Sequence, residues 1–224
     1  KAELQTVIEN EKIDYVVIAL NVEASAKRMK KELVEMYGVE ENKVIASSFV
    51  NVKLTHSQTL LPMLENTLSA AMLTLNDIDA FAINNGPGSF TGVRIGVAAA
   101  KGLAWGGQLP CYGVSTLEAM ALQLGVYDGY VLPVMDARRA QVYNALFRVE
   151  NGTYTRIRDD RAIALSELGE ELQTLDGPIF LVGDGSVLCY NTLKAQVAKL
   201  TLAPEHLQHQ SGRLCFRLKG DRSP

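Results

Sequence analysis

Apolar positions in the first part of the chain alternate between short continuous runs and stripes at helical spacing. Short apolar runs are typical of buried strands, and stripes that recur every three or four residues are typical of amphipathic helices. The predicted elements are a strand at 13–20, a helix at 22–38, a strand at 44–53, a helix at 56–73 and a strand at 80–83. This alternation of strand and helix predicts an α/β lobe.

The first three of these elements predict a parallel pair of strands. Two strands joined through a helix normally form a right-handed βαβ unit. We therefore expect residues 14–20 to pair in parallel with residues 44–53, and the helix at 22–38 to cross over one face of their sheet.

The pattern changes character near Gly125, where strands begin to follow one another directly. Before that point the chain predicts a helix that ends near Trp105, a strand at 111–114 and a helix at 115–124. After it we expect strands at 129–136, 139–149 and near 154–157, a helix at 166–175, a strand at 178–185 that ends in a glycine turn, and a helix at 190–200. The later part of the chain therefore predicts a second, mixed lobe.

The helix from Val93 to Trp105 is apolar around most of its circumference, and Arg94 and Lys101 are its only charged residues. A helix of this kind must be buried on more than one side. Its own sheet covers one face. The other face, rich in Gly and Ala, needs another helix, which comes from residues 56–73 or from a protein partner.

The loop before this helix, GPGSFTG at residues 86–92, has the residue types of a phosphate-binding turn. It is not a Walker loop, because Val93 and Arg94 follow its last glycine, and Thr91 replaces the third glycine of a dinucleotide fingerprint. Two interpretations remain open. One is a tight strand-to-helix turn, and the other is an anion site made by glycine backbone and the free amides of a helix start.

The composition of the 224 residues, 47% hydrophobic and 21% charged, is typical of a soluble globular protein. A net charge of −3 and the lack of a long Lys/Arg tract argue against direct nucleic-acid binding. No apolar run is long enough to span a membrane, and the three cysteines form no CxxC pair. We therefore expect a cytoplasmic protein without a zinc site or a disulfide framework.

Several stretches together are more specific than any of these patterns. They are THSQTLLPMLENTL, LNDIDAFAINNGPGSFTGVRIGVAAAKGLA, YGVSTLEAMA, PVMDARRAQVYNALF and FLVGDG, in this order. Over residues 47–205 they closely resemble the TsaB (YeaZ) family, which is needed to make threonylcarbamoyladenosine in tRNA.

The resemblance implies an α/β, actin-like or Hsp70-like two-lobe fold of the RNase H type. It also implies a non-catalytic subunit that dimerises with the related catalytic subunit TsaD, works with the ATPase TsaE and meets tRNA only through the complex, with a homodimer possible when it is alone. The family contact is a helical bundle that corresponds to about 56–73 and 92–105 here. The interface residues expected from it are His56, Leu60, Leu64, Arg94, Val97, Ala98, Lys101 and Trp105.

The same resemblance argues against chemistry in this chain. In TsaD-type subunits two histidines of an Asn-His-x-x-x-His segment bind a metal, and Thr116 and Met120 stand at those positions here. We expect no catalytic residue, no metal site and no cofactor. The glycine loop is then a vestigial phosphate loop, with Gly86, Gly88, Ser89, Thr91 and Gly92 as its residues. The alternative is an actin-like, ATP-binding enzyme that uses the loops at 86–92 and 183–185.

Both ends of the chain depart from the family. Residues 1–46 lack the Asp-Thr-Ser turn of the family and predict an atypical α/β segment, and residues 211–224 predict a poorly ordered tail. Between them we expect an N-terminal lobe at 47–124 and a C-terminal lobe at 125–210. A natural replacement and a non-functional chimeric or truncated gene product both explain this departure.

Overall fold

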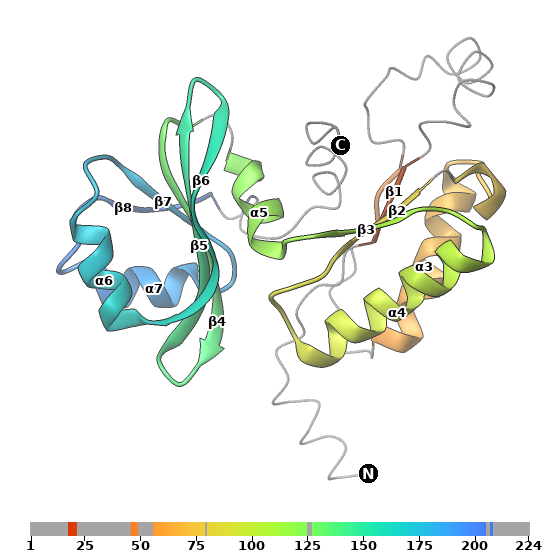
Figure 1. Ribbon diagram of the computed structural model, residues 1–224, viewed down its shortest axis with the longest axis horizontal. Helices are drawn as coiled ribbons and strands as arrows, with labels where there is room; N and C mark the ends of the chain where they lie inside the picture. The colour runs from red at the N-terminus through yellow and green to blue at the C-terminus, as the bar shows by residue number, and fades with distance from the viewer. Residues whose placement is uncertain are drawn as a thin grey trace. The chain divides into compact units, whose positions relative to one another are not determined.

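The chain folds into two compact units, each with its own sheet (Figure 1). The structure is a computed structural model and describes residues 18–21, 46–48, 56–78, 80–124, 127–204 and 207. Of the described residues, unit 1 comprises those up to Asn85 together with Ser89–Val114, and unit 2 comprises Gly86–Gly88 and those from Ser115 onward. The contacts thus place residues 115–124 in unit 2, whereas the sequence analysis placed them in the first lobe.

Unit 1 is built around a small sheet with strand order β1-β2-β3. Its described elements are β1 (Ile18–Asn21), α3 (His56–Ala70), η1 (Leu75–Asp77), β2 (Ala80–Asn84), α4 (Phe90–Gly106) and β3 (Cys111–Val114). β2 is buried along its whole length and lies in the middle of the sheet, parallel to β3. The elements predicted at 56–73, 80–83 and 111–114 are confirmed with small shifts of their ends.

The predicted parallel pairing of residues 14–20 with 44–53 falls mostly outside the described residues, and the described part of this strand has a different neighbour. β1 pairs antiparallel with β2, with Ile18 opposite Ile83 and Asn21 opposite Ala80. The buried β2 needs a neighbour on each side to satisfy its amides and carbonyls, and β1 takes the side that β3 leaves open. Residues 46–48 are not in a strand. The helix predicted at 22–38 and the other residues of the strand predicted at 44–53 lie outside the described residues.

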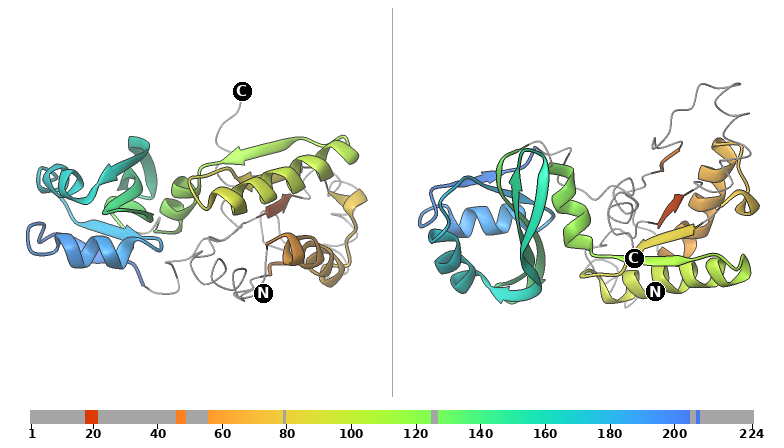
Figure 2. Two further views of the ribbon diagram at one scale, coloured as in Figure 1. Left: turned by 90° about the horizontal axis from the view of Figure 1, so that it is seen from below. Right: turned by 45° about the horizontal axis from the view of Figure 1, so that its top comes forward.

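The helices α3 and α4 lie next to one another and pack on β2 (Figures 1 and 2). The buried positions of α4, Gly92, Gly96, Ala100 and Ala104, are all small, so its backbone comes close to the sheet. The core between the helices and β2 is formed by Leu64, Leu68, Leu73, Ile78, Phe81 and Ala104. The expectation that α3 covers part of α4 is therefore confirmed.

Unit 2 contains a mixed sheet with strand order β6-β5-β4-β7-β8. Its elements are α5 (Thr116–Ala121), η2 (Leu122–Leu124), β4 (Gly129–Arg138), β5 (Gln141–Glu150), β6 (Thr153–Ala164), α6 (Leu165–Gln173), β7 (Ile179–Val182), α7 (Ser186–Leu193) and β8 (Leu200–Leu202). β4, β5 and β6 form antiparallel hairpins, and β7 and β8 add in parallel. Inward and outward side chains alternate along β4 and β5 and fill a core on each face.

The two faces of this sheet carry separate cores. α6 and α7 cover one face, where Leu168 and Leu193 pack on Leu132 of β4. α5 covers the other face, where Leu117 packs with Val131 (Figure 1). A sheet with both faces covered explains why β4 reads as an almost continuous apolar run.

The helix predicted at 190–200 is wrong in position. α7 ends at Leu193, and Leu200 begins β8, which pairs in parallel with β7. The apolar spacing of Leu193, Val197 and Leu200 continues a helical period, but the free edge of β7 recruits the last of these residues as strand. Within the part of the chain that the structure describes, no helix is long and apolar enough to cross a membrane.

Candidate functional site

The glycine loop after β2 is fixed by hydrogen bonds at both of its ends. Gly86 has φ +116°, a conformation that disfavours any residue with a Cβ atom, and its carbonyl accepts the Thr116 amide of α5 at 2.8 Å. Ser89 is the N-cap of α4, and its hydroxyl accepts the Gly92 amide at 3.2 Å. The loop therefore caps two helix starts, which supports the interpretation as a tight turn. Phosphate binding by its residues Gly86, Gly88, Ser89, Thr91 and Gly92 stays a prediction.

The second glycine turn, Gly183-Asp184-Gly185, is packed directly on β4. A Cβ atom on Gly183 would lie 2.3 Å from the Val134 carbonyl oxygen, and one on Gly185 would lie 2.9 Å from the Asp136 amide nitrogen. The Gly185 amide also donates to the Val134 carbonyl at 3.1 Å. Close packing against the strand thus accounts for both glycines without a ligand.

The two positions that hold histidines in TsaD-type subunits lie inside the core of unit 2. Thr116 is 3% exposed and Met120 is 2% exposed, and both belong to α5. Among the described residues, no three His, Cys, Asp or Glu side chains gather as metal ligands would. The side chain of His56 lies outside the description, although its backbone begins α3.

The side of α4 that faces away from the sheet is exposed and carries two aromatic rings. Phe90 is 70% exposed and Trp105 is 87% exposed, and Arg94, Ala98 and Lys101 lie exposed between them. We call these five residues the α4 stripe. The Arg94 guanidinium stacks on the Phe90 ring at 4.0 Å, so a cation–π contact orders one end of the stripe.

The other predicted interface residues are less available. Leu60 and Val97 are partly buried. Leu64 is buried in the core of unit 1 between α3, α4 and β2, so its contact with a partner stays a prediction. Phe90 was missed from the sequence because it stands in the loop motif. Its place one residue after a Ser N-cap was the available signal.

Neither cation of the α4 stripe makes an ion pair with a carboxylate in the described part of the chain. Burial raises the pKa of the nearby Cys111 thiol, and the positive charge of Lys101 partly offsets this effect. Burial also raises the pKa of the Cys189 thiol, to about 12, so that Cys189 is an unreactive core residue. With aromatic rings at its ends and two cations between them, the α4 stripe is apolar at its ends and positively charged in the middle.

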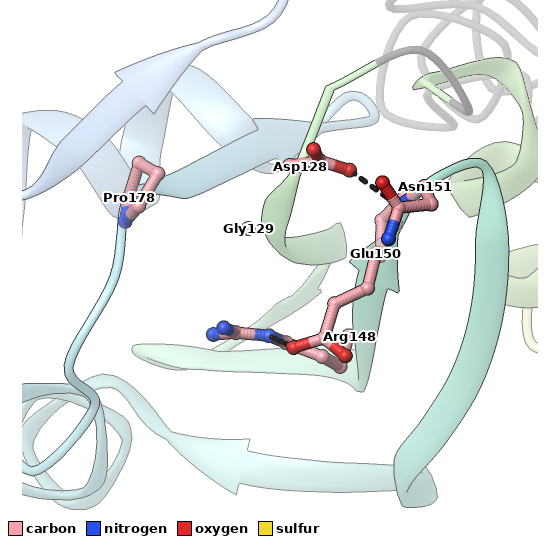
Figure 3. A pocket seen from close by; sticks show the side chains of 7 residues that line it. Asp128, Gly129, Arg148, Glu150, Asn151 and Pro178 are labelled. Atoms are coloured by element: carbon pink, nitrogen blue, oxygen red, sulfur yellow. Dashed lines mark hydrogen bonds and ion pairs between the residues drawn. The ribbon is translucent and has the colours of Figure 1, made fainter.

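A hollow of about 340 Å³ lies in unit 2 at one end of the β4–β5 hairpin (Figure 3). Asp128, Arg148, Glu150 and Pro178 are among the residues that line it, and the Asp128 carboxylate accepts the Asn151 amide at 2.8 Å. The Arg148 Nε donates to Glu150 at 2.9 Å. Its guanidinium also stacks on the Tyr130 ring and lies 3.6 Å from the Asp176 carboxylate. The one cation of the hollow is thus already engaged by side chains of unit 2.

The turn between β4 and β5 is a solvated hairpin corner. The Asp136 carboxylate accepts the Arg138 amide at 2.7 Å, and Arg138, Arg139 and Ala140 all have positive φ and are exposed. Asp side chains commonly hold turns in this way. The hydrogen bond gives Asp136 a structural part in the corner.

Comparison with known proteins connects this arrangement to a family. Residues 43–178 match the family model described as "TsaD: tRNA N6-adenosine threonylcarbamoyltransferase". A "tRNA threonylcarbamoyladenosine biosynthesis protein TsaB" of Bacillus subtilis is 35% identical over 67% of this chain and 66% of its own length. The protein of the same name from Buchnera aphidicola subsp. Schizaphis graminum is 31% identical over 72% of this chain and 80% of its own length. The chain thus spans just under two thirds of the Bacillus relative.

A solved structure agrees with these sequence relatives. It is described as an uncharacterized protein with similarity to peptidase YEAZ from Pseudomonas aeruginosa, and it matches with a TM-score of 0.61 and 25% identity over 78% of this chain and 79% of its own. The likeness confirms the expected actin-like, Hsp70-like two-lobe α/β fold. The chain therefore belongs to the TsaB (YeaZ) family, within the wider family whose model describes tRNA N6-adenosine threonylcarbamoyltransferases.

Proposed function

We propose that this chain is a non-catalytic subunit of the machinery that makes threonylcarbamoyladenosine at adenosine 37 of tRNA. In this proposal it docks through α4 on a TsaD-type catalytic subunit, works beside a TsaE-type ATPase and meets tRNA only through the complex. The observation that carries the proposal is the exposed α4 stripe, with Phe90 and Trp105 largely in solvent. The names of the relatives support the pathway.

The exposed rings supply the apolar area that an interface needs. Burial of a large apolar side chain contributes roughly 1.5–3 kcal/mol, and aromatic residues with Arg are enriched among the residues that dominate binding energy. Phe90, Arg94 and Trp105 have these residue types and lie on one helix face. An exposed patch of this kind on a soluble chain favours a protein partner over solvent.

The absence of catalysis in this chain is supported by α5. Thr116 and Met120 offer weak ligands for a metal that histidines bind in TsaD-type subunits, and both side chains are committed to the core. The glycine turns at 86–92 and 183–185 are used for helix capping and for packing on β4. No observation on these turns calls for a nucleotide.

Co-purification with the TsaD-type subunit of the same genome tests the proposal. We expect a complex with the wild-type chain, and about tenfold or greater loss of affinity after Trp105→Ala. Leu188→Ala, which removes another exposed apolar side chain from α7 of unit 2, is the control and leaves the affinity unchanged. Modification activity of the reconstituted mixture is expected to need both proteins. A complex that forms equally well with Trp105→Ala would contradict docking through α4.

A further inference from the structure

The order of residue types along the α4 stripe is the same from either end of the helix. Aromatic residues stand at its ends, Phe90 and Trp105, with one cation inside each, Arg94 and Lys101, and Ala98 near its centre. These positions are three or four residues apart, so they lie on one face of the helix. An antiparallel partner helix would therefore meet the same order of chemistry from either end.

One position beside this face has no explanation within the described part of the chain. Gly102 lies inside α4 and is exposed, and a Cβ atom added there would meet nothing within 4 Å. Glycine destabilises a helix relative to alanine, so a tight contact inside the unit would normally account for its presence. Gly92 and Gly96 are buried and Gly106 is the last residue of α4, where glycine is common, so their presence is explained; that of Gly102 is not. Close approach of a helix from another chain would explain a glycine at this position.

The charges of the stripe decide which helix fits. If a second copy of the chain packed its α4 antiparallel on the first, Phe90 would face Trp105 of the other copy, and Arg94 would face its Lys101. The rings would gain contact, but cation would face cation at two points, and like charges across an interface are strongly unfavourable. The neighbouring helix α3 could compensate little of this repulsion, because Glu65 is its only acidic residue.

We propose that the α4 stripe selects, over a second copy of this chain, a partner helix that carries two carboxylates about two turns apart. These carboxylates pair with Arg94 and Lys101, apolar side chains cover Phe90 and Trp105, and the helix backbone approaches closely over Gly102. The identification of this helix with a TsaD-type subunit rests on the proposed function. The charge preference itself belongs to α4 and is testable with this chain alone.

The test uses the chain with its stripe charges reversed as an acidic probe of known geometry. Wild-type protein and the Arg94→Glu/Lys101→Glu variant are each examined alone and as an equimolar mixture by sedimentation velocity. Emission of Trp105, the only tryptophan of the chain, reports burial of the stripe. We expect a mixed dimer at least about tenfold tighter than either self-association, with a blue shift of the tryptophan emission, because only the mixture places opposite charges across the helices.

Two variants make the result specific to α4. Arg139→Glu/Lys194→Glu changes the net charge of the chain equally but on exposed residues of unit 2, and it is expected to form no mixed dimer with wild type. Gly102→Leu, placed in both members of the mixture, is expected to weaken the mixed dimer about tenfold while the variants stay folded by circular dichroism, because the site is open in the free chain. A mixture no tighter than its components overturns the proposal.

A binding experiment with the TsaD-type subunit distinguishes failure of this proposal from failure of the proposed function. Arg94→Gln/Lys101→Gln is expected to weaken the complex with the TsaD-type subunit about tenfold and to flatten its salt dependence. If that complex forms with wild type and is unchanged by the double variant, docking stands and the charge selection is overturned. If no complex forms but the mixed dimer does, the proposed function fails and the charge preference of α4 stands.

Discussion

At the scale of single residues, glycine has two opposite uses in this chain. Gly183 has φ +104° and leaves no room for a Cβ atom against the Val134 carbonyl, so the fold of unit 2 requires glycine there. Gly102 lies in a regular helix with open space around it, so the fold of unit 1 does not. The same residue type thus indicates packing in one unit and an external contact in the other.

Gly183→Ala is expected to lower the free energy of unfolding by about 3 kcal/mol or more. Two unfavourable terms add. Alanine would have to adopt a left-handed backbone conformation, and its Cβ atom would lie 2.3 Å from the Val134 carbonyl oxygen, so the backbone would have to shift. Denaturant unfolding followed by circular dichroism measures the change. Gly102→Ala is the matched control, and it is expected to raise stability by about 0.5–1 kcal/mol. Equal effects at the two positions would show that the turn does not press on β4.

The exposed residues of α4 stand out in the sequence more clearly than the buried residues of α3. Trp105, Arg94 and Lys101 are identified because large or charged residues stand out in a helix of Gly and Ala. The core packing of Leu64 could not be predicted, because a leucine on a helix next to α4 fits equally well against the sheet and against a partner. Periodicity gives the apolar face of a helix but not what covers it.

At the scale of elements, the edge strand β6 is held to α5 by a group of ion pairs. Arg156 lies 3.0 Å from the Glu118 carboxylate of α5 and 2.6 Å from that of Asp160, and its guanidinium stacks on the Phe147 ring. The Ser115 hydroxyl, which caps α5, also donates to Asp160. A long edge strand with charged side chains at its exposed positions resists pairing with another chain, so the group both anchors and protects it.

Arg156→Met is expected to destabilise unit 2 by about 1–2 kcal/mol. The methionine stem keeps some contact with Phe147, but Glu118, whose side chain is only 15% exposed, loses its cation. The loss, measured by denaturant unfolding, is expected to shrink with added salt. Arg158→Met is the control, because Arg158 pairs with Glu171 from a side chain that is 52% exposed and should contribute less than about 0.5 kcal/mol. A larger loss at Arg158 than at Arg156 would contradict this assignment.

Most elements could be predicted from the sequence because their apolar patterns are clear, as for the helical stripe of α3 and the continuous apolar runs of β4 and β7. The failures come from strand pairing, which depends on residues far apart in the chain. Nothing near Ile18 indicates that its strand pairs with β2, and nothing near Leu200 indicates that β7 has a free edge. Local pattern gives the strand, whereas the identity of its neighbour is a property of the whole sheet.

At the scale of the whole molecule, the apolar burial of the described residues is divided unequally between the units. The sheet of unit 2 is covered on both faces, and buried side chains of α5, α6 and α7 pack on β4, β5 and β7. In the described part of unit 1, one cluster between α3, α4 and β2 forms the core. Because apolar burial dominates stability, the units are expected to open with different free energies.

Hydrogen exchange on the intact chain tests this division. The amides of β4, β5 and β7 are expected to exchange last, and those of β2 and β3 about tenfold faster or more, because unit 1 opens at lower cost. Mass spectrometry of peptides from each strand measures the rates. The turn residues Arg139 and Ala140 provide an exposed reference that exchanges early. Equal protection of β2 and β5 would mean that the two units unfold as one.

Addition of the TsaD-type subunit turns the same measurement into a test of where binding acts. A ligand at one hundred times its dissociation constant stabilises the state that it binds by about 2.7 kcal/mol, or roughly a hundredfold in the opening equilibrium. If docking occurs through α4, the slowing is expected in α4 and β2 and not in β5, whose exchange is set by the core of unit 2. Slowing confined to unit 2 would place the contact there and would contradict docking through α4.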